Sequence, residues 1–122
     1  MKILVVDDNV DSAESLALLL AMGGHETEVG HDGPAAMDAA ARFLPDVMLL
    51  DIGLPRMDGL EVCRRVREET WGTDMAMIPL IGFGQDSDRL ESESAGFDRH
   101  MVKPIDYDAL VQTLNSLSLP RS

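Results

Sequence analysis

Three aspartates and one lysine occupy positions from which they could form a single charged site. Each comes at or directly after the end of a short apolar run, and the four are Asp7, Asp8, Asp51 and Lys103. Clustered carboxylates repel one another and raise one another's pKa unless a cation joins them. Carboxylate oxygens suit Mg²⁺, which is typically held together with water and phosphate oxygens. A lysine adds a point charge for phosphate, so these residue types point to phosphate chemistry with Mg²⁺.

Each of these residues also has a plain explanation. Aspartate is common after strands because it favours turns and helix N-caps, and a lone lysine before a proline is usually a solvated surface residue. Only the joint pattern indicates a site, because a fold that gathers several carboxylates at one place needs a cation to offset their repulsion.

The apolar runs alternate with longer amphipathic stretches along the whole chain. We expect strands over 2–6, 26–29, 46–50, 75–81 and 99–102, and helices over 12–22, 34–43, 60–69, 87–95 and 106–117. Continuous apolar strands separated by helices predict a doubly wound parallel sheet, covered on both faces. Ligands of such sheets bind outside the carboxyl ends of the strands. The three aspartates and Lys103 are therefore expected at one edge of the sheet.

Composition narrows the class of protein. The chain has 122 residues, which predicts a single domain over 1–122, and 22 acidic against 10 basic residues, for a net charge of -12. Direct nucleic-acid binding is disfavoured, because such affinity comes mainly from Lys and Arg neutralising phosphates. The single cysteine, Cys63, excludes an internal disulfide. The first apolar run is too short for a signal peptide or a membrane span, so we expect no membrane association and a cytoplasmic location.

Four segments in order match a known family. They are VVDD at 5–8, DIGLPRMDG at 51–59, GFGQDSD at 82–88 and AGFDRHMVKP at 95–104. Over essentially its whole length the chain resembles the receiver domain of bacterial response regulators. The later motifs are similar to receivers partnered with or fused to hybrid sensor histidine kinases. The resemblance implies a chemotaxis-regulator-like fold, the flavodoxin-like (βα)5 three-layer sandwich with five parallel strands in the order 2-1-3-4-5.

The resemblance also implies a role for each residue of the site. Asp51 is the phosphoacceptor and, together with Asp8, a ligand of Mg²⁺. Asp7 holds the metal through a water molecule, and the backbone carbonyl of Gly53 is a further ligand. Lys103 pairs with the phosphoryl oxygens.

The family's switch positions fall on Ile81, Gly82 and His100, and its cis peptide bond precedes Pro104. The family carries Thr or Ser where this chain has Ile81, and that hydroxyl binds a phosphoryl oxygen. The small residue Gly82 supports the alignment. His100 stands where the family has an aromatic residue, and either a surface position or an inward-packing switch ring fits it.

The isoleucine leaves two hypotheses open. In the first, Asp51 is still phosphorylated but the conformational response is weaker, since a lost hydrogen bond to a charged group is worth about 1.5–3 kcal/mol. In the second, the chain is a phosphate-independent interaction module, a pseudo-receiver. The first is favoured because every charged member of the site is present.

The function implied by the resemblance is a phosphorelay step. The chain would take a phosphoryl group from a histidine kinase or a histidine phosphotransfer protein, and it would catalyse at most its own phosphorylation and dephosphorylation. The family's output face corresponds to residues 87–117, where a homodimer could form. A flavin-dependent enzyme of similar fold is disfavoured, because the acidic pair stands where a Gly-rich phosphate loop would be needed.

Overall fold

A computed structural model describes residues 1–52, 54, 59–81, 101–102 and 105–117. Within them, five strands form one sheet in the order β2-β1-β3-β4-β5. Their bounds are β1 Lys2–Val6, β2 Glu26–Gly30, β3 Val47–Asp51, β4 Ala76–Ile81 and β5 Met101–Val102. All four pairings are parallel. The predicted parallel sheet and its strand order are confirmed, although the described part of β5 has only two residues.

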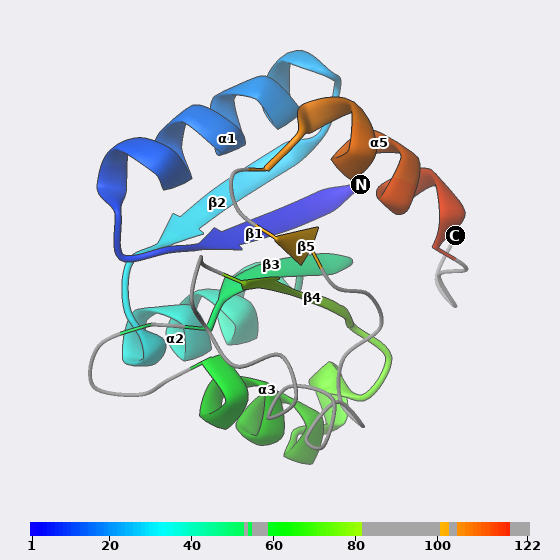
Figure 1. Ribbon diagram of the computed structural model, residues 1–122. Helices are drawn as coiled ribbons and strands as arrows, with labels where there is room; N and C mark the ends of the chain where they lie inside the picture. Colours follow the sequence, from blue (N-terminus) through cyan, green and yellow to red (C-terminus); the bar gives the residue numbers. More distant parts are fainter. Residues whose placement is uncertain (53, 55–58, 82–100, 103–104, 118–122) are drawn as a thin grey trace.

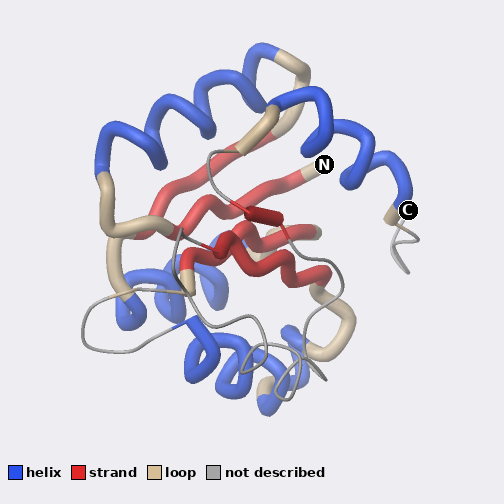
Figure 2. The backbone as a smooth tube through the Cα atoms, in the orientation of Figure 1, coloured by secondary structure: helices blue, strands red, loops and turns tan. Residues whose placement is uncertain are grey.

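Helices cover both faces of this sheet. Their bounds are α1 Val10–Met22, α2 Gly33–Phe43, α3 Gly59–Glu68 and α5 Tyr107–Ser116, with a short 3₁₀ helix, η1, at Thr70–Gly72. α1 and α5 lie over one face, and α2 and α3 lie over the other (Figure 1). Figure 2 shows the same three layers, with the strands in red between the helices. The helix expected over 87–95 lies outside the described residues.

The core follows from the two-residue period of the strands. Side chains of one parity, such as Ile3 and Leu49, pack under α1 and α5. Those of the other parity, such as Leu4 and Met48, pack against α2 and α3. Every residue of β3 is buried. Both faces are therefore apolar, as expected for a parallel sheet between two helical layers.

Several predicted boundaries were wrong by one or two residues, and local hydrogen bonds explain the clearest case. α1 begins at Val10 rather than at Ser12, because the side chain of Asn9 accepts a 3.0 Å hydrogen bond from the Ser12 amide and caps the helix. β3 is shifted by one residue relative to the predicted 46–50, so that it begins at Val47 and includes Asp51. The last helix, α5, is also capped by a side chain, since a carboxylate oxygen of Asp106 accepts a hydrogen bond from the Asp108 amide.

Among the described helices, none combines the length and the apolar character needed to cross a membrane.

Candidate functional site

The three aspartates converge at the carboxyl edge of the sheet. β1 and β3 are neighbours, and their register pairs Val6 with Leu50. Each of these two residues is followed by an aspartate, Val6 by Asp7 and Leu50 by Asp51, so the two aspartates lie side by side. Carboxylate oxygens of Asp7, Asp8 and Asp51 all lie within 4.8 Å of one another. The predicted gathering of these three residues is confirmed.

Asp7 is held by hydrogen bonds to both its backbone and its side chain. It is only 3% exposed. Its amide donates to the carbonyl of Gly30 at 3.1 Å, which continues the β1–β2 pairing by one bond. Its carboxylate accepts a 3.0 Å hydrogen bond from the amide of Asn9. Asp8, the next residue, is exposed, so the cluster can be approached from solvent.

Asp51 is fixed by the close approach of α3. It is 5% exposed. A Cβ atom on Gly59 would lie 2.7 Å from the backbone oxygen of Asp51 and 2.8 Å from the Cα atom of Ile52, so only glycine fits there. The Gly59 amide donates to the carbonyl of Ile52 at 3.1 Å. The start of α3 and the end of β3 are thus packed backbone to backbone.

Ile81 ends β4, as predicted, and has an apolar environment. Its side chain is 7% exposed and packs with Ile52 and Leu60 in a small cluster separate from the two main ones. Ile52 directly follows Asp51, so this apolar cluster borders the acidic one.

Sequence reasoning missed His31. This residue directly follows β2, and its Nδ1 atom lies 3.1 Å from the backbone oxygen of Asp7. A usable signal was present, because β2 is the neighbour of β1 and its carboxyl end must lie beside the Asp7–Asp8 pair.

The other predicted site residues lie outside the described part of the chain. They are Gly53, Gly82, His100, Lys103 and Pro104. About half of the proposed 87–117 face lies outside it as well, and the described part is 101–102 and 105–117.

The donor set suits a hard divalent cation. All three groups are carboxylates, two of them buried and one exposed, and oxygen-only sites of this kind favour Mg²⁺ over softer metals. A cation there would offset the mutual repulsion of the carboxylates. Asp7, Asp8 and Asp51 are the residues that could hold such a cation.

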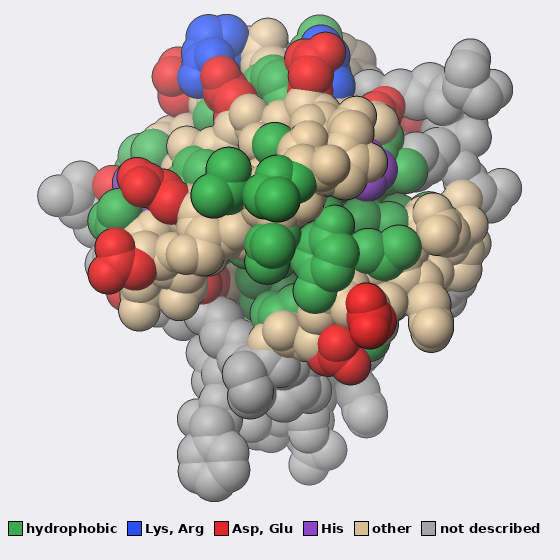
Figure 3. Space-filling view, turned by 90° about the horizontal axis from the view of Figure 1, so that it is seen from above, with side chains coloured by type: hydrophobic (Ala, Val, Ile, Leu, Met, Phe, Trp, Pro, Cys, Tyr) green, Lys and Arg blue, Asp and Glu red, His purple; other side chains and the backbone are tan. Residues whose placement is uncertain are grey.

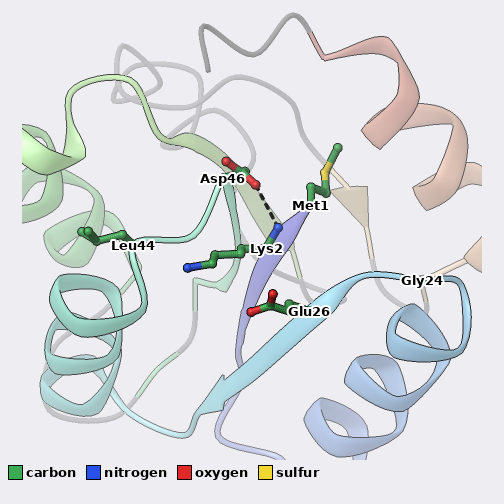
Figure 4. Close-up of a pocket in the computed structure, with 6 residues that line it drawn as sticks. All are labelled: Met1, Lys2, Gly24, Glu26, Leu44 and Asp46. Atoms are coloured by element: carbon green, nitrogen blue, oxygen red, sulfur yellow. Dashed lines mark hydrogen bonds between the residues drawn. The ribbon is translucent and has the colours of Figure 1, made fainter. Parts of the chain in front are cut away.

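A pocket of about 480 Å³ lies at the opposite edge, near the amino ends of the strands (Figure 4). It was not predicted, and it is lined by Met1, Lys2, Gly24, Glu26, Leu44 and Asp46. Here an acidic side chain supports the backbone, because the Lys2 amide donates to a carboxylate oxygen of Asp46 at 2.8 Å. The Asp46 amide in turn donates to the Lys2 carbonyl, also at 2.8 Å.

Comparison with known proteins gives one consistent family. A family model described as the response regulator receiver domain matches residues 3–115. Response regulator MprA from Mycobacterium avium is 38% identical over 117 residues, which make up 96% of this chain and 50% of that protein. The chain therefore spans about half the length of the curated relatives that it matches.

Solved structures agree with the sequence relatives. The chemotaxis protein CheY4 of Vibrio cholerae superposes with a TM-score of 0.86 at 26% identity, covering 96% of this chain and 98% of that one. A receiver domain of the Francisella response regulator 1452 superposes with a TM-score of 0.81 at 25% identity, with 93% of each chain covered.

Proposed function

Because the chain belongs to the response regulator receiver domain family, we propose that it is a phosphoacceptor module of two-component signalling and that Asp51 takes the phosphoryl group. One observation carries this proposal. Asp51 is a buried carboxylate that ends an inner strand and shares a 4.8 Å cluster with Asp7 and Asp8. The donor would be a phosphohistidine on a histidine kinase or a histidine phosphotransfer protein, the donors that receiver domains use.

Phosphoryl transfer depends mainly on the positioning of the attacking oxygen and of charged groups around phosphorus. A carboxylate oxygen of Asp51 attacks phosphorus, the bond from phosphorus to the donor's imidazole nitrogen breaks, and the imidazole leaves with the bonding electrons. Asp51 can hold this attack geometry because Gly59 and Ile52 fix its backbone. Mg²⁺, when bound, supplies charge stabilisation for the oxygens of the phosphoryl group. Lys103 is proposed to contact another of those oxygens.

The test is intact mass after incubation with acetyl phosphate and Mg²⁺. We expect a gain of one phosphoryl group that requires the metal and is absent in Asp51→Asn. Asp46→Asn is the matched control, because Asp46 flanks the other end of the same strand, and it should react as the wild type does. A folded wild-type protein that gains no mass with Mg²⁺ present would rule out the acceptor role.

The second candidate function is a phosphate-independent interaction module, and the packing of Ile81 favours it. Ile81 packs in an apolar cluster with Ile52 and Leu60, next to the proposed acceptor. A phosphoryl oxygen on Asp51 would meet methyl groups there in place of a hydroxyl donor, so phosphorylation would gain less from any inward movement of the following loop.

Ile81→Thr separates the two candidates. If phosphorylation survives and only the response is weak, the threonine should enlarge the phosphate-induced change in NMR chemical shifts, while Ile81→Val should leave it as in the wild type. An unchanged response in Ile81→Thr would contradict the weakened-switch hypothesis. A response absent in all three proteins would favour the phosphate-independent module.

A partner surface is available on α1. Its outward side carries the exposed apolar residues Leu18, Leu19 and Met22, together with the acidic Asp11 and Glu14. Figure 3 looks down on the α1 and α5 face and shows hydrophobic side chains gathered near its middle, with acidic ones around them. A helical donor protein with an apolar centre and basic surroundings fits this face. Leu18→Glu should slow transfer from a phosphohistidine protein but not from acetyl phosphate, and equal slowing would contradict this docking.

Four sequence-based expectations stay predictions. We propose no catalysis beyond the chain's own phosphorylation and dephosphorylation. Homodimerisation through the 87–117 face, the cytoplasmic location and the absence of direct nucleic-acid binding belong to the same proposal, and sedimentation with and without acetyl phosphate would test the first of these three.

A further inference from the structure

The ring of His31 reaches back from the end of β2 to the main chain of the acidic site. Its Nδ1 atom lies 3.1 Å from the backbone oxygen of Asp7, 24 residues earlier in the chain. A carbonyl oxygen can only accept, so Nδ1 must carry the proton and donate. In a neutral ring this selects the Nδ1–H tautomer and leaves Nε2 as the acceptor nitrogen.

This bond extends the sheet beyond its last backbone pairing. The β1–β2 register ends at Val6 and Gly30, and the Asp7 amide still donates to the Gly30 carbonyl. In a continuing parallel ladder, the Asp7 carbonyl would accept the next available amide of the neighbouring strand. The chain instead turns into α2, with Asp32 as its N-cap. The His31 ring therefore donates to Asp7 where the regular strand pairing has stopped.

The bonded carbonyl belongs to the peptide unit that carries Asp8. A peptide is planar, so the Asp7 oxygen and the Asp8 Cα atom move as one rigid group. The Asp7 side chain is fixed separately by the amide of Asn9. One hydrogen bond thus holds the Asp7 carboxylate, and the other holds the main chain from which the Asp8 side chain extends. Both act against the mutual repulsion of three carboxylates within 4.8 Å.

We propose that His31 is a positioning residue for the cation site, because it holds the Asp7–Asp8 peptide in the orientation that directs both carboxylates toward Asp51. The use of this site in phosphorylation rests on the function proposed above, but the geometric role does not. Removing a residue that hydrogen-bonds to a metal ligand typically lowers the protein's affinity for the metal by about 10–100-fold. Because the His31 bond is to the main chain, we expect a loss of cation affinity at the lower end, about tenfold.

The first experiment measures cation affinity. Mn²⁺ is the probe, since carboxylate sites bind it as they bind Mg²⁺, and its free ion is counted by electron paramagnetic resonance in the full chain. His31→Ala should bind Mn²⁺ about tenfold more weakly. His31→Asn should stay within about threefold of the wild type, because its amide nitrogen is attached to Cγ just as Nδ1 is and can donate to the same carbonyl. His25→Ala is the control, because His25 lies at the opposite end of β2, before its first residue. It should bind Mn²⁺ as the wild type does.

Two outcomes would overturn the proposal. One is a folded His31→Ala protein with wild-type Mn²⁺ affinity, even if its melting temperature is lower, because a merely structural residue would give that result. The other is His31→Asn binding as weakly as His31→Ala, which would show that the donor atom is not what matters.

The second experiment needs no metal and no variant. The ¹⁵N chemical shifts of the His31 ring, recorded on metal-free protein at alkaline pH where imidazoles are neutral, distinguish the two tautomers. The Nδ1–H form is expected, and the Nε2–H form would overturn the proposal. Failure here is distinguishable from failure of the proposed function. Wild-type protein that shows the Nδ1–H form and binds Mn²⁺ but gains no phosphoryl group would leave His31 in its role and remove only the acceptor role of Asp51.

Discussion

β3 has an aspartate at each of its ends, and the two serve different purposes. Asp46 directly precedes the strand, at the amino edge of the sheet, and its carboxylate accepts from the backbone amide of Lys2 at 2.8 Å. Asp51 ends the strand, at the carboxyl edge, and lies in a cluster with Asp7 and Asp8. The carboxylate of Asp46 stabilises the pairing of β3 with β1, whereas that of Asp51 lies beside two other carboxylates. The comparison teaches that an aspartate beside a buried strand is a better candidate for a site residue when a second carboxylate lies at the end of the neighbouring strand.

The largest expected difference between the two edges is in their response to Mg²⁺. At about 100 times its Kd, a cation that binds only the folded state should raise the free energy of unfolding by about 2.7 kcal/mol. Asp8→Asn should lose most of this gain, and Asp46→Asn should keep it. Urea unfolding with Mg²⁺ and with a chelator measures this gain in each variant. An equal gain in the two variants would contradict a cation site confined to the carboxyl edge.

Glycines at the two edges should differ in the size and kind of their effects. Gly59→Ala forces a Cβ atom to within 2.7 Å of the Asp51 oxygen, and such overpacking costs about 1–3 kcal/mol. Gly24→Ala meets no atom within 4 Å, but its φ is +97°, so only backbone strain of about 1–2 kcal/mol is expected. Only Gly59→Ala should also weaken Mg²⁺ binding. Calorimetric titration would contradict this if Gly24→Ala weakened binding as much.

A smaller effect is expected at Leu44, which lines the amino-edge pocket. It adopts a left-handed backbone, with φ 51° and ψ 61°, at the end of α2. Leu44→Asn should stabilise the fold by up to about 1 kcal/mol, because asparagine tolerates this conformation better than leucine. Leu19→Asn is the control, since Leu19 is 44% exposed against 42% for Leu44 but lies within α1. Leu19→Asn should destabilise the fold. If thermal unfolding showed that both substitutions stabilise it, the explanation from the backbone conformation of Leu44 would be refuted.

The smallest effect concerns pH at the amino edge. The pKa of His25 is lowered, first because partial burial disfavours the charged ring and second because the Met1 ammonium group is near. The unfolded chain therefore binds more protons just below the ordinary value of 6.5, and stability should fall as pH drops through that window. His25→Gln should reduce the difference in urea midpoint between about pH 7.5 and about pH 5.5. An unchanged difference would assign the pH dependence to other groups.

Much of the site could be predicted because it depends on strand ends. Apolar runs such as 2–6 mark the inner strands, and the parallel arrangement then brings Asp7 and Asp51 to the same edge without knowledge of any side-chain contact. The start of α1 could not be predicted in this way. Val10 precedes the apolar periodicity of the helix, and only the Asn9 cap shows where the helix begins.

The position of His31 near the site could have been inferred from the strand order, but the individual contacts that hold the site could not, for a physical reason. The hydrogen bond from His31 to Asp7 depends on the turn after β2 and on the β1–β2 register, and neither is encoded in a local pattern. The need for glycine at position 59 likewise comes from the close approach of α3 to β3. By contrast, Ile81 was located correctly because a strand end needs only the extent of an apolar run, while its effect on phosphorylation stays a hypothesis.

The acidic cluster is attached to two inner strands of the described sheet, β1 and β3. β1 is paired on both sides, with β2 and β3, and β3 is paired on both sides, with β1 and β4. Backbone amides in such doubly paired, buried strands exchange their hydrogens with solvent mainly when the whole domain unfolds. A cation bound by Asp8 and Asp51 would therefore slow hydrogen exchange throughout β1 and β3, including at Ile3 and Val47 near the opposite ends of these strands. In this molecule, occupancy of the site should be readable from the protection of amides that never touch it.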